Sequence, residues 1–479
     1  MAKLLGIDVG TSATKALLID EDGRVLKQAS SSYPLHTPRP TWAEQDPLDW
    51  KRAVGECIEQ IGETKPDAIG LTGQMHGMVA LDAGGEAVCP AILWCDQRTE
   101  QECREIDDTV GAETVRAITG NPPLTGFQLP KVLWLRNNAL SSFTRTTDVL
   151  LPKDYIRLAL TGDKATDVSD ASGVGLLNLQ GREWSAEMAA QLELDPSLFP
   201  KVFESDQVAG VTKGSEYLED GIPVVAGGGD QAAGAVGTGA VVPGVVSISL
   251  GTSGVVFASV PSPEPDPTGA VHVFCHANRG WHAMGVMLSC GGAVKWLRDT
   301  MYPGERFSAL DNEAAKVAPG CEGLTFLPYL SGERCPHNDP SARGAFAGLT
   351  LSQGRAHLAR AVIEGATFGL ADCLDRMTRL GVEAGEVRVT GGGAKSDLWM
   401  QTLADVLDTP CTRIEGDEGP AFGAALLAGV GAGVWSNVGE ACSSTVRLGA
   451  AFEPSGADYA AARGRFASLY PALKVWNLA

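Results

Sequence analysis

The sequence lacks several features that mark common classes of function. It has no Gly-Lys dipeptide, which excludes a phosphate-binding loop of the Walker-A type. Its 11 cysteines form no Cys-x-x-Cys pair, as is usual in a reducing compartment. Only 38 basic residues stand against 58 acidic ones, and the net charge of -20 argues against a nucleic-acid or anionic-membrane surface. A nucleotide remains a candidate ligand, because backbone N–H groups can hold phosphates without a basic patch.

Long apolar runs are missing as well. No run reaches 18 residues, and the first ten residues enter a strand pattern without the apolar core of a signal peptide. We therefore predict a cytoplasmic protein with neither a membrane nor a nucleic-acid partner. With 479 residues, 44% of them hydrophobic and 20% charged, the chain should fold into two globular domains with a cleft between them.

An internal repeat supports two domains. Residues 7–12 and 248–253 both read as a strand that ends in a Gly-Thr-Ser turn, and another strand follows each turn. A strand, three glycines and a helix follow at 223–237 and again at 387–407. Either similarity alone could arise by chance in a glycine-rich chain, but two in the same order make chance a poor explanation.

The repeat divides the chain into residues 1–242 and 243–479, with a boundary and candidate hinge near Val242-Pro243-Gly244. Residues 3–33 predict a three-stranded antiparallel meander, and a helix and another strand follow it. The same order in each half predicts an α/β fold with two mixed sheets flanked by helices. The first half carries the longer insertions, where a specific substrate would be recognised.

The two Gly-Thr-Ser turns are candidate phosphate sites. Small residues let backbone N–H groups approach phosphate oxygens closely, and the hydroxyls add donors. Asp8 lies just before the first turn, whereas Ser249 holds the equivalent place before the second. Only the first half therefore offers a carboxylate that could hold Mg²⁺, directly or through water. The alternative role for Asp8 is to cap its turn.

The triple glycines differ in the same way. Gly229 precedes Asp230, whereas Gly393 precedes Ala394. A carboxylate at a strand end beside a helix start could accept a proton from a substrate hydroxyl, while Ala394 leaves room for the flat ring of a nucleotide. The alternative role for Asp230 is that of a helix N-cap.

Histidines offer two further candidates. His272, His276 and His282, with Cys275, could suggest a metal site, but their alternation favours a core hairpin. His76 lies in the segment GQMHG, after a strand and between two glycines. It is either a substrate-facing residue or a buried histidine with satisfied hydrogen bonds.

Together these features resemble the FGGY carbohydrate kinases of the actin-like, ribonuclease H-like ATPase superfamily. The resemblance covers nearly the whole chain and includes residues 6–20, 73–77, LPKDY at 151–155, 224–237, 249–255, 326–334, 344–365 and 389–397. It implies two actin-like/ribonuclease H-like domains with a catalytic cleft between them. It also implies that ATP and Mg²⁺ are used to phosphorylate a small sugar.

The resemblance further implies a role for each candidate residue. Asp230 would be the general base, and Asp8 would hold Mg²⁺ through water. The sugar would contact Gln74, Met75, His76, Asp230 and Gln231. The nucleotide and its phosphates would contact Thr11, Ser12, Lys15, Thr252, Gly291, Gly392, Gly393 and Asp397.

Within the family, GQMHG, WCDQR at 94–98 and SGER with PHN at 331–338 are more similar to xylulokinases than to glycerol, ribulose or gluconate kinases. Gln128 stands where a small hydroxyl residue or proline is usual, and Gln231 where asparagine is frequent. Both departures touch substrate preference. The alternatives are a kinase for another ketose, polyol or aldonate, and an actin-like or chaperone-like ATPase that acts on a protein. The oligomeric state stays open, with a homodimer as one alternative.

Overall fold

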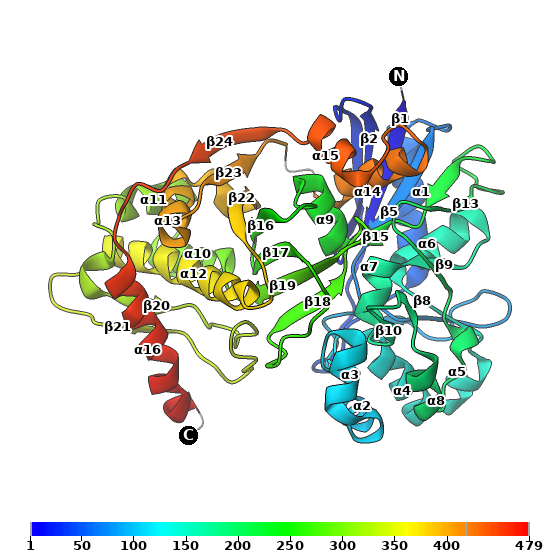
Figure 1. The fold of residues 1–479 in the computed structure, drawn as a ribbon, viewed down its shortest axis with the longest axis horizontal. Coiled ribbons are helices and arrows are strands. Elements are labelled where there is room, and N and C mark those ends of the chain that lie inside the picture. The colour runs from blue at the N-terminus through cyan, green and yellow to red at the C-terminus, as the bar shows by residue number, and fades with distance from the viewer. Residues whose placement is uncertain (1, 417–418, 478–479) are drawn as a thin grey trace.

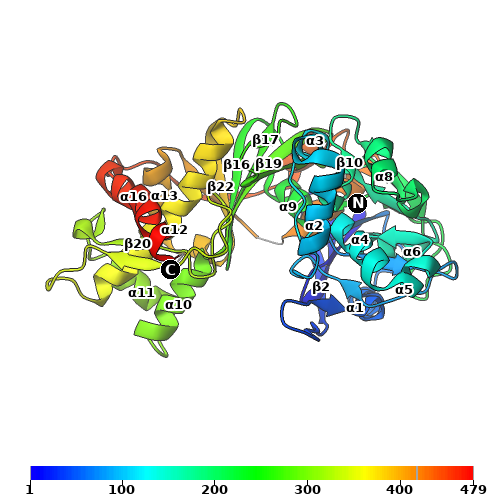
Figure 2. The same cartoon turned by 90° about the horizontal axis from the view of Figure 1, so that it is seen from below.

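The computed structural model describes residues 2–416 and 419–477 and has two lobes, each built on a seven-stranded mixed sheet (Figure 1). Figure 2 shows the lobes side by side, with the blue and cyan N-terminal elements in one and the yellow and red C-terminal elements in the other. The predicted α/β architecture of two flanked mixed sheets is confirmed. No helix within the described ranges is both long and apolar enough to cross a membrane.

The first sheet contains the predicted meander. β1 pairs antiparallel with β2, which pairs antiparallel with β3, while β5 lies parallel to β1 on its other side. The strand order is β13-β14-β5-β1-β2-β3, with β15 paired to β5. The bounds are β1 (Lys3–Val9), β2 (Ala13–Asp20), β3 (Val25–Ser32), β5 (Ala68–Gly73), β13 (Val208–Val211), β14 (Pro223–Val225) and β15 (Gly228–Gly229).

The second sheet repeats this pattern. β16 pairs antiparallel with β17 and parallel with β22, as β1 does with β2 and β5. The order is β18-β19-β17-β16-β22-β23-β24. The bounds are β16 (Gly244–Leu250), β17 (Gly254–Val260), β18 (Val271–Cys275), β19 (Trp281–Met287), β22 (Ala384–Thr390), β23 (Cys411–Ile414) and β24 (Leu448–Phe452). The predicted hairpin of the histidine segment is β18 and β19.

Helices cover both sheets. Asp46 caps α1 by accepting from the Leu48 N–H at 2.9 Å, and Pro47 occupies the first turn, as the sequence predicts. The first lobe contains α1 (Pro47–Ile61), α2 (Glu100–Ile106), α3 (Ala112–Thr119), α4 (Gln128–Asn138), α5 (Leu140–Arg145), α6 (Pro152–Thr161), α7 (Val168–Ala171), α8 (Ala186–Gln191) and α9 (Asp230–Thr238). The second lobe contains α10 (Gly291–Met301), α11 (Phe307–Ala314), α12 (Arg355–Thr378), α13 (Asp397–Leu407) and α16 (Ala460–Asn477).

Two late helices, α14 (Pro420–Gly431) and α15 (Val438–Thr445), lie on the first lobe (Figure 1). A Cβ at Gly6 or Gly70 would come within 2 Å of an α14 carbonyl oxygen, so glycine is needed for this close packing. After α15 the chain returns to the second sheet as β24. A division at Val242 follows the sequence repeat, but α14 and α15 pack across it, because the apolar face of the first sheet would otherwise be exposed.

Candidate active site

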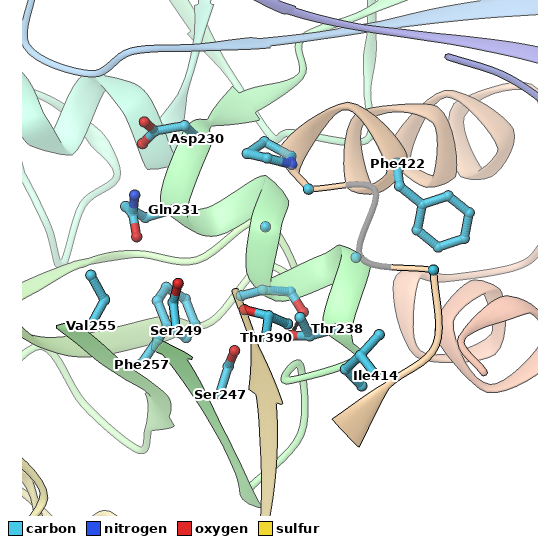
Figure 3. Close-up of a pocket in the computed structure, with 16 residues that line it drawn as sticks. Asp230, Gln231, Thr238, Ser247, Ser249, Val255, Phe257, Thr390, Ile414 and Phe422 are labelled. Carbon is cyan, nitrogen blue, oxygen red and sulfur yellow. Dashed lines mark hydrogen bonds between the residues drawn. The ribbon is translucent and has the colours of Figure 1, made fainter. Parts of the chain in front are cut away.

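A cavity of about 270 Å³ lies where the lobes meet (Figure 3). The start of α9 forms one wall and strands β16, β17 and β22 another, while α14 lies at the far side. Its lining includes Asp230, Gln231, Ser247, Ser249, Val255, Phe257, Thr390 and Phe422. Of the candidate residues, only Asp230 and Gln231 line it. The cavity therefore reaches one end of the predicted site.

Asp230 is the first residue of α9 and follows the N-cap Gly229, so the alternative that Asp230 itself is the N-cap is wrong. Its carboxylate is partly buried, and burial raises its pKa to about 6. Hydrogen bonds from the backbone and side chain of Gln231 act in the opposite direction. A carboxylate with such a pKa is ionised at neutral pH but remains basic enough to accept a proton.

Asp8, near the end of β1, is the second carboxylate of the site. Burial and, to a smaller extent, the charge of Asp230 raise its pKa to about 7, although the charge of Lys15 opposes both. Lys15 stands opposite Asp8 in the β1–β2 register. The Asp8 Oδ1 atom is buried and accepts no hydrogen bond from the described residues. A cation would remove this unfavourable arrangement, and oxygen donors suit Mg²⁺.

The donor set around Asp8 is sparse. Among the described residues, no group of three or more His, Cys, Asp or Glu side chains could hold a metal ion. Magnesium in kinases is usually held by one or two carboxylates, water and the phosphates of the substrate. Asp8 fits that pattern, with its Oδ1 atom as the protein donor.

The first turn is already engaged within its own lobe. The Thr11 hydroxyl accepts from Trp94 Nε1 at 2.9 Å and donates to Gln74 Oε1 at 3.3 Å. Ser12 is exposed. Backbone N–H groups and Ser12 are thus the accessible donors of this turn, while the Thr11 hydroxyl connects it to the GQMHG segment.

Within GQMHG, Gln74 and Met75 face different surroundings. The Gln74 amide is buried and donates to Gln45 Oε1 at 3.1 Å, so it supports the loop from behind. Met75 lies beside the glycine that precedes Asp230, since a Cβ at Gly229 would stand 2.9 Å from Met75 Cγ. Met75 therefore packs against the residue before Asp230 and directly precedes His76 in the chain.

One ring nitrogen of His76 is already hydrogen-bonded within the protein. Its Nδ1 lies 2.6 Å from the Gly173 carbonyl oxygen and must carry the proton to donate there. Burial lowers the pKa of His76 to about 3, so the ring is neutral at physiological pH. The ring stacks on Phe127 at 4.6 Å, and no hydrogen bond from the described chain reaches Nε2. Nε2 can therefore accept a hydrogen bond from a hydroxyl group.

The backbone of His76 is held in an unusual conformation. Its φ is 67°, in the left-handed region that side chains other than glycine rarely adopt. The buried Lys131 donates to the His76 carbonyl at 2.8 Å, and Gln128 donates to the Gly77 carbonyl at 2.8 Å. Gln128 is therefore a support of the loop and does not line the cavity. Because both partners come from α4, sequence spacing could not indicate them.

Arg334 is a candidate that sequence reasoning matched only as part of SGER. Its charge lowers the pKa of both His76 and His272, so the second lobe brings a cation toward the GQMHG loop. Its guanidinium has no side-chain hydrogen bond within the described residues, although the charge of the adjacent Glu333 acts on it. The neighbouring Glu333 anchors the segment by accepting from the Leu288 N–H at 2.9 Å. Arg334 is thus available to a ligand.

The second lobe gathers the nucleotide candidates around the end of β16. The Gly291 N–H donates to the Gly251 carbonyl at 2.7 Å and the Gly292 N–H donates to Thr252 at 2.9 Å, so the second turn sits at the start of α10. A Cβ at Gly393 would stand 2.7 Å from Leu250 Cβ.

Gly392 and Asp397 border open space in this lobe. A Cβ at Gly392 would meet no atom within 4 Å. Asp397 is largely exposed and accepts from Arg413 at 2.8 Å. All five nucleotide candidates in this half, Thr252, Gly291, Gly392, Gly393 and Asp397, thus belong to the second lobe, whereas Asp8 belongs to the first.

The histidines of the hairpin formed by β18 and β19 belong to the core. His276 Nε2 lies 3.1 Å from the Ala240 carbonyl oxygen, and His282 stacks on Phe257 at 4.1 Å. Both rings are fully buried, and burial lowers their pKa values. The prediction of a core hairpin is confirmed.

Comparisons with known proteins agree with this geometry. Residues 3–237 match the N-terminal domain of the FGGY family of carbohydrate kinases, and residues 246–432 match its C-terminal domain. The xylulose kinase of Escherichia coli is 41% identical over 443 residues, which cover 89% of this chain and 90% of that protein. The gluconokinase of Bacillus subtilis is 29% identical over 88% of this chain and 86% of its own.

A solved structure is equally similar. The xylulose kinase of Brucella ovis superposes with a TM-score of 0.92 at 39% identity, covering 99% of this chain and 100% of the other. The matched domains span most of the sequence, and the two lobes, their repeated hairpins and the cavity between them are accounted for by one family. The chain belongs to the FGGY family of carbohydrate kinases.

Proposed function

We propose that this kinase transfers the γ-phosphoryl group of ATP to the terminal hydroxyl of D-xylulose, giving D-xylulose 5-phosphate. The observation that carries the proposal is that Asp230, a carboxylate with a raised pKa, and the neutral His76 both adjoin Met75, Asp230 through Gly229 and His76 as the next residue of the chain. A short sugar chain could lie over Met75 with its reacting end at Asp230 and its other hydroxyls at His76. Relatives between 36% and 42% identical are xylulose kinases, which supports the ketose.

The reaction would follow from these positions. The Asp230 carboxylate accepts the proton of the terminal hydroxyl as that oxygen bonds to the γ-phosphorus. The bond between the γ-phosphorus and the bridging oxygen breaks, and ADP leaves. His76 Nε2 accepts a hydrogen bond from a second sugar hydroxyl and holds the chain in line. The protein takes little covalent part in this reaction, because positioning of the substrates supplies much of the rate acceleration.

The phosphates would be held from both lobes. We propose that the turns at Thr11-Ser12 and Thr252, together with Lys15, contact them, and that Gly291, Gly392, Gly393 and Asp397 border the nucleoside. Mg²⁺, held by Asp8 through water, would neutralise charge on the phosphate oxygens when bound. The proposed partners are thus the sugar and ATP, in the cytoplasm, and the homodimer left open by the sequence is a question for analytical ultracentrifugation.

A coupled assay of ADP release would test the substrate. The purified protein would be given ATP and Mg²⁺ with D-xylulose, D-ribulose, glycerol or D-gluconate in turn. We expect kcat/KM to be highest for D-xylulose by at least tenfold, because His76 and Gln231 would form hydrogen bonds with its hydroxyl groups. A higher kcat/KM for any other sugar would contradict the proposal.

An aldonate is the second candidate substrate, and Arg334 is the observation that favours it. An arginine whose guanidinium hydrogen-bonds to no described residue suits a carboxylate, which it can bind through two parallel hydrogen bonds. If gluconate were the substrate, Arg334→Met would abolish its turnover and spare D-xylulose. If D-xylulose is the substrate, the same change should raise its KM only modestly, since a neutral oxygen forms a weaker bond with arginine.

A further inference from the structure

Five charged side chains lie fully buried in the first lobe, beneath the segment that ends in Asp230. They are Lys153, Asp154, Arg157, Asp167 and Asp170, and each is 0% exposed. The proposed reaction uses none of them. Buried charges are costly unless they are paired, and apolar residues often replace them without loss of stability. Their presence under the catalytic segment therefore calls for a reason other than stability.

Arg157 binds the first part of that segment. Its guanidinium donates to the carbonyl oxygens of Val224 at 3.5 Å and of Ala226 at 2.8 Å, and also to that of Val225. Val224 and Val225 belong to β14, and the chain then runs through the glycines to Asp230. One side chain thus binds three successive carbonyls ahead of the catalytic turn.

Lys153 binds the other end of the segment through two intermediates. Its Nζ lies 2.6 Å from Asp154, 3.0 Å from Asp167 and 3.4 Å from Asp170. The other oxygen of Asp167, Oδ2, accepts from Ser169 Oγ at 2.5 Å. Ser169 Oγ in turn accepts from the Gly229 N–H at 3.1 Å. The chain of contacts therefore ends at the peptide that immediately precedes Asp230.

The local structure explains why this support is needed. Gly229 is the N-cap of α9 but has no side chain, so it cannot fix the first turn of the helix itself. Lys153 and Arg157 are four residues apart and share one face of α6. One helix face therefore holds residues 224–226 at one end and Gly229 at the other.

We propose that Lys153, Arg157, Asp167 and Ser169 are positioning residues, which hold the segment before Asp230 so that its carboxylate stays within reach of the substrate hydroxyl. The inference rests on the proposed role of Asp230 as the base. A displacement of about 1 Å in an active site can cost on the order of 100-fold in rate. Loss of one contact in this network should therefore lower kcat without removing a group that touches substrate.

Two buried serines offer a matched test. Ser169 and Ser205 are both 0% exposed, and both donate to Asp167 Oδ2, Ser205 at 2.8 Å. Only the Ser169 hydroxyl also accepts from the Gly229 N–H. Ser169→Ala and Ser205→Ala would be compared in the full-length protein by kcat, by KM for D-xylulose and ATP, and by melting temperature.

We expect Ser169→Ala to lower kcat about tenfold with both KM values within about threefold, while Ser205→Ala keeps kcat within about twofold of the parent. Both variants should lose a similar amount of melting temperature. An equal kcat in the two variants would overturn the proposal. So would a raised KM for the sugar at unchanged kcat, since Ser169 lies near Gly173, which binds His76.

Lys153→Met extends the test to the cation. It should lower kcat more than Ser169→Ala, again at similar KM values, and a normal kcat would contradict the inference. Asp230→Asn separates this inference from the proposed function. If that variant stays active, the assignment of the base fails; if it is inactive while Ser169→Ala is normal, only the positioning role fails.

Discussion

The two lobes share one fold but not one chemistry. Asp8 on β1 pairs with Thr72 on β5, and at the equivalent register Ser249 on β16 pairs with Thr390 on β22. The turns and the parallel strand recur, but Asp8 has no acidic counterpart. The prediction that the two triple-glycine segments are equivalent is wrong: residues 391–393 follow β22, which matches β5, whereas residues 227–229 follow β14, which matches β23. A duplicated scaffold can therefore keep its backbone sites for phosphate in both copies, while the carboxylates are confined to one.

The insertions differ in the same direction. In the first lobe, α2 to α8 lie between β5 and β14, and they include the α4 residues that hold His76 and the α6 and α7 residues beneath Asp230. In the second lobe, the matching connection runs from β22 to β23 and carries α13. The helices α10 to α12 and the segment with Arg334 lie instead between β19 and β22, which match β3 and β5. Substrate recognition and proton transfer thus depend on the added elements of the first lobe.

The largest expected effect comes from removing the acid at the start of α9, because α14, which follows the matching strand β23, begins with Pro420. Asp230→Asn should lower kcat by about 10²- to 10⁴-fold, because the amide cannot accept the proton. Asp195→Asn, at an exposed turn of the same lobe, is the control and should keep full activity. Circular dichroism would verify folding, and turnover near the parent value would rule out Asp230 as the base.

Making β1 resemble β16 should have the next largest effect. Asp8→Ser places the side chain of Ser249 in the first lobe and removes the only carboxylate proposed to hold Mg²⁺. We expect activity or apparent Mg²⁺ affinity to fall by about 10- to 100-fold, as for residues that orient metal-bound water. A titration of the rate with Mg²⁺ would measure this, and an unchanged half-saturation would refute the metal role of Asp8.

His76→Ala tests the part of the site that the inserted elements of the first lobe support. Loss of the Nε2 acceptor should raise the KM for D-xylulose about tenfold, which corresponds to one hydrogen bond, and leave the KM for ATP nearly unchanged. Steady-state kinetics with each substrate varied would separate the two constants. An equal rise in both would indicate that His76 serves only to shape the loop.

The buried carboxylate of Asp8, which the second lobe replaces with Ser249, should also affect the stability of the fold. The folded-state pKa of Asp8 is about 7 against 3.8 in a model compound, so the ligand-free fold disfavours its charged form. This cost is absent below pH 3.8, grows as pH rises, and is complete above about pH 7. Asp8→Asn should therefore raise the melting temperature at pH 8 by a few °C and have little effect at pH 4. The same rise in melting temperature at pH 4 and pH 8 would contradict the link between stability and the ionisation of Asp8.

Much of this arrangement could be predicted from sequence, for identifiable reasons. The hairpins and triple glycines have local signatures, because turns need particular residues, and they gave the α/β fold and Asp230. The support of His76 by Lys131 and of Gly229 by Ser169 depends on contacts between residues at least 55 positions apart, which no local pattern encodes. The packing of α14 on the first sheet was missed because the repeat suggested that each half would cover itself.

The smallest expected effect is a change in the radius of gyration when the two lobes move toward each other. Asp8 and Asp230 lie in the first lobe and the nucleoside candidates in the second, so the γ-phosphate must be brought to within about 3.5 Å of the sugar oxygen. Where the chain passes between the lobes, Gly239, Gly244, Gly416 and Gly419 have positive φ values, which suits hinges. The β18–β19 hairpin, however, is already joined to the first lobe, where Asn121 donates to the Val273 carbonyl at 2.7 Å and Trp281 donates to Leu179 at 2.9 Å.

The contacts of that hairpin with the first lobe should act as the pivot, so closure would be a rotation of the whole second lobe about them, with β19 still paired to β17, rather than a translation. A compact chain of 479 residues has a radius of gyration of about 23 Å, and rotation about an existing contact should reduce it by only about 1 Å. Small-angle scattering with D-xylulose and a non-hydrolysable ATP analogue, compared with the ligand-free protein, would measure this. An unchanged radius in a sample shown to bind both ligands would favour a preformed site. A reduction of several ångströms would show that the β18–β19 contacts break and that the hairpin is not the pivot.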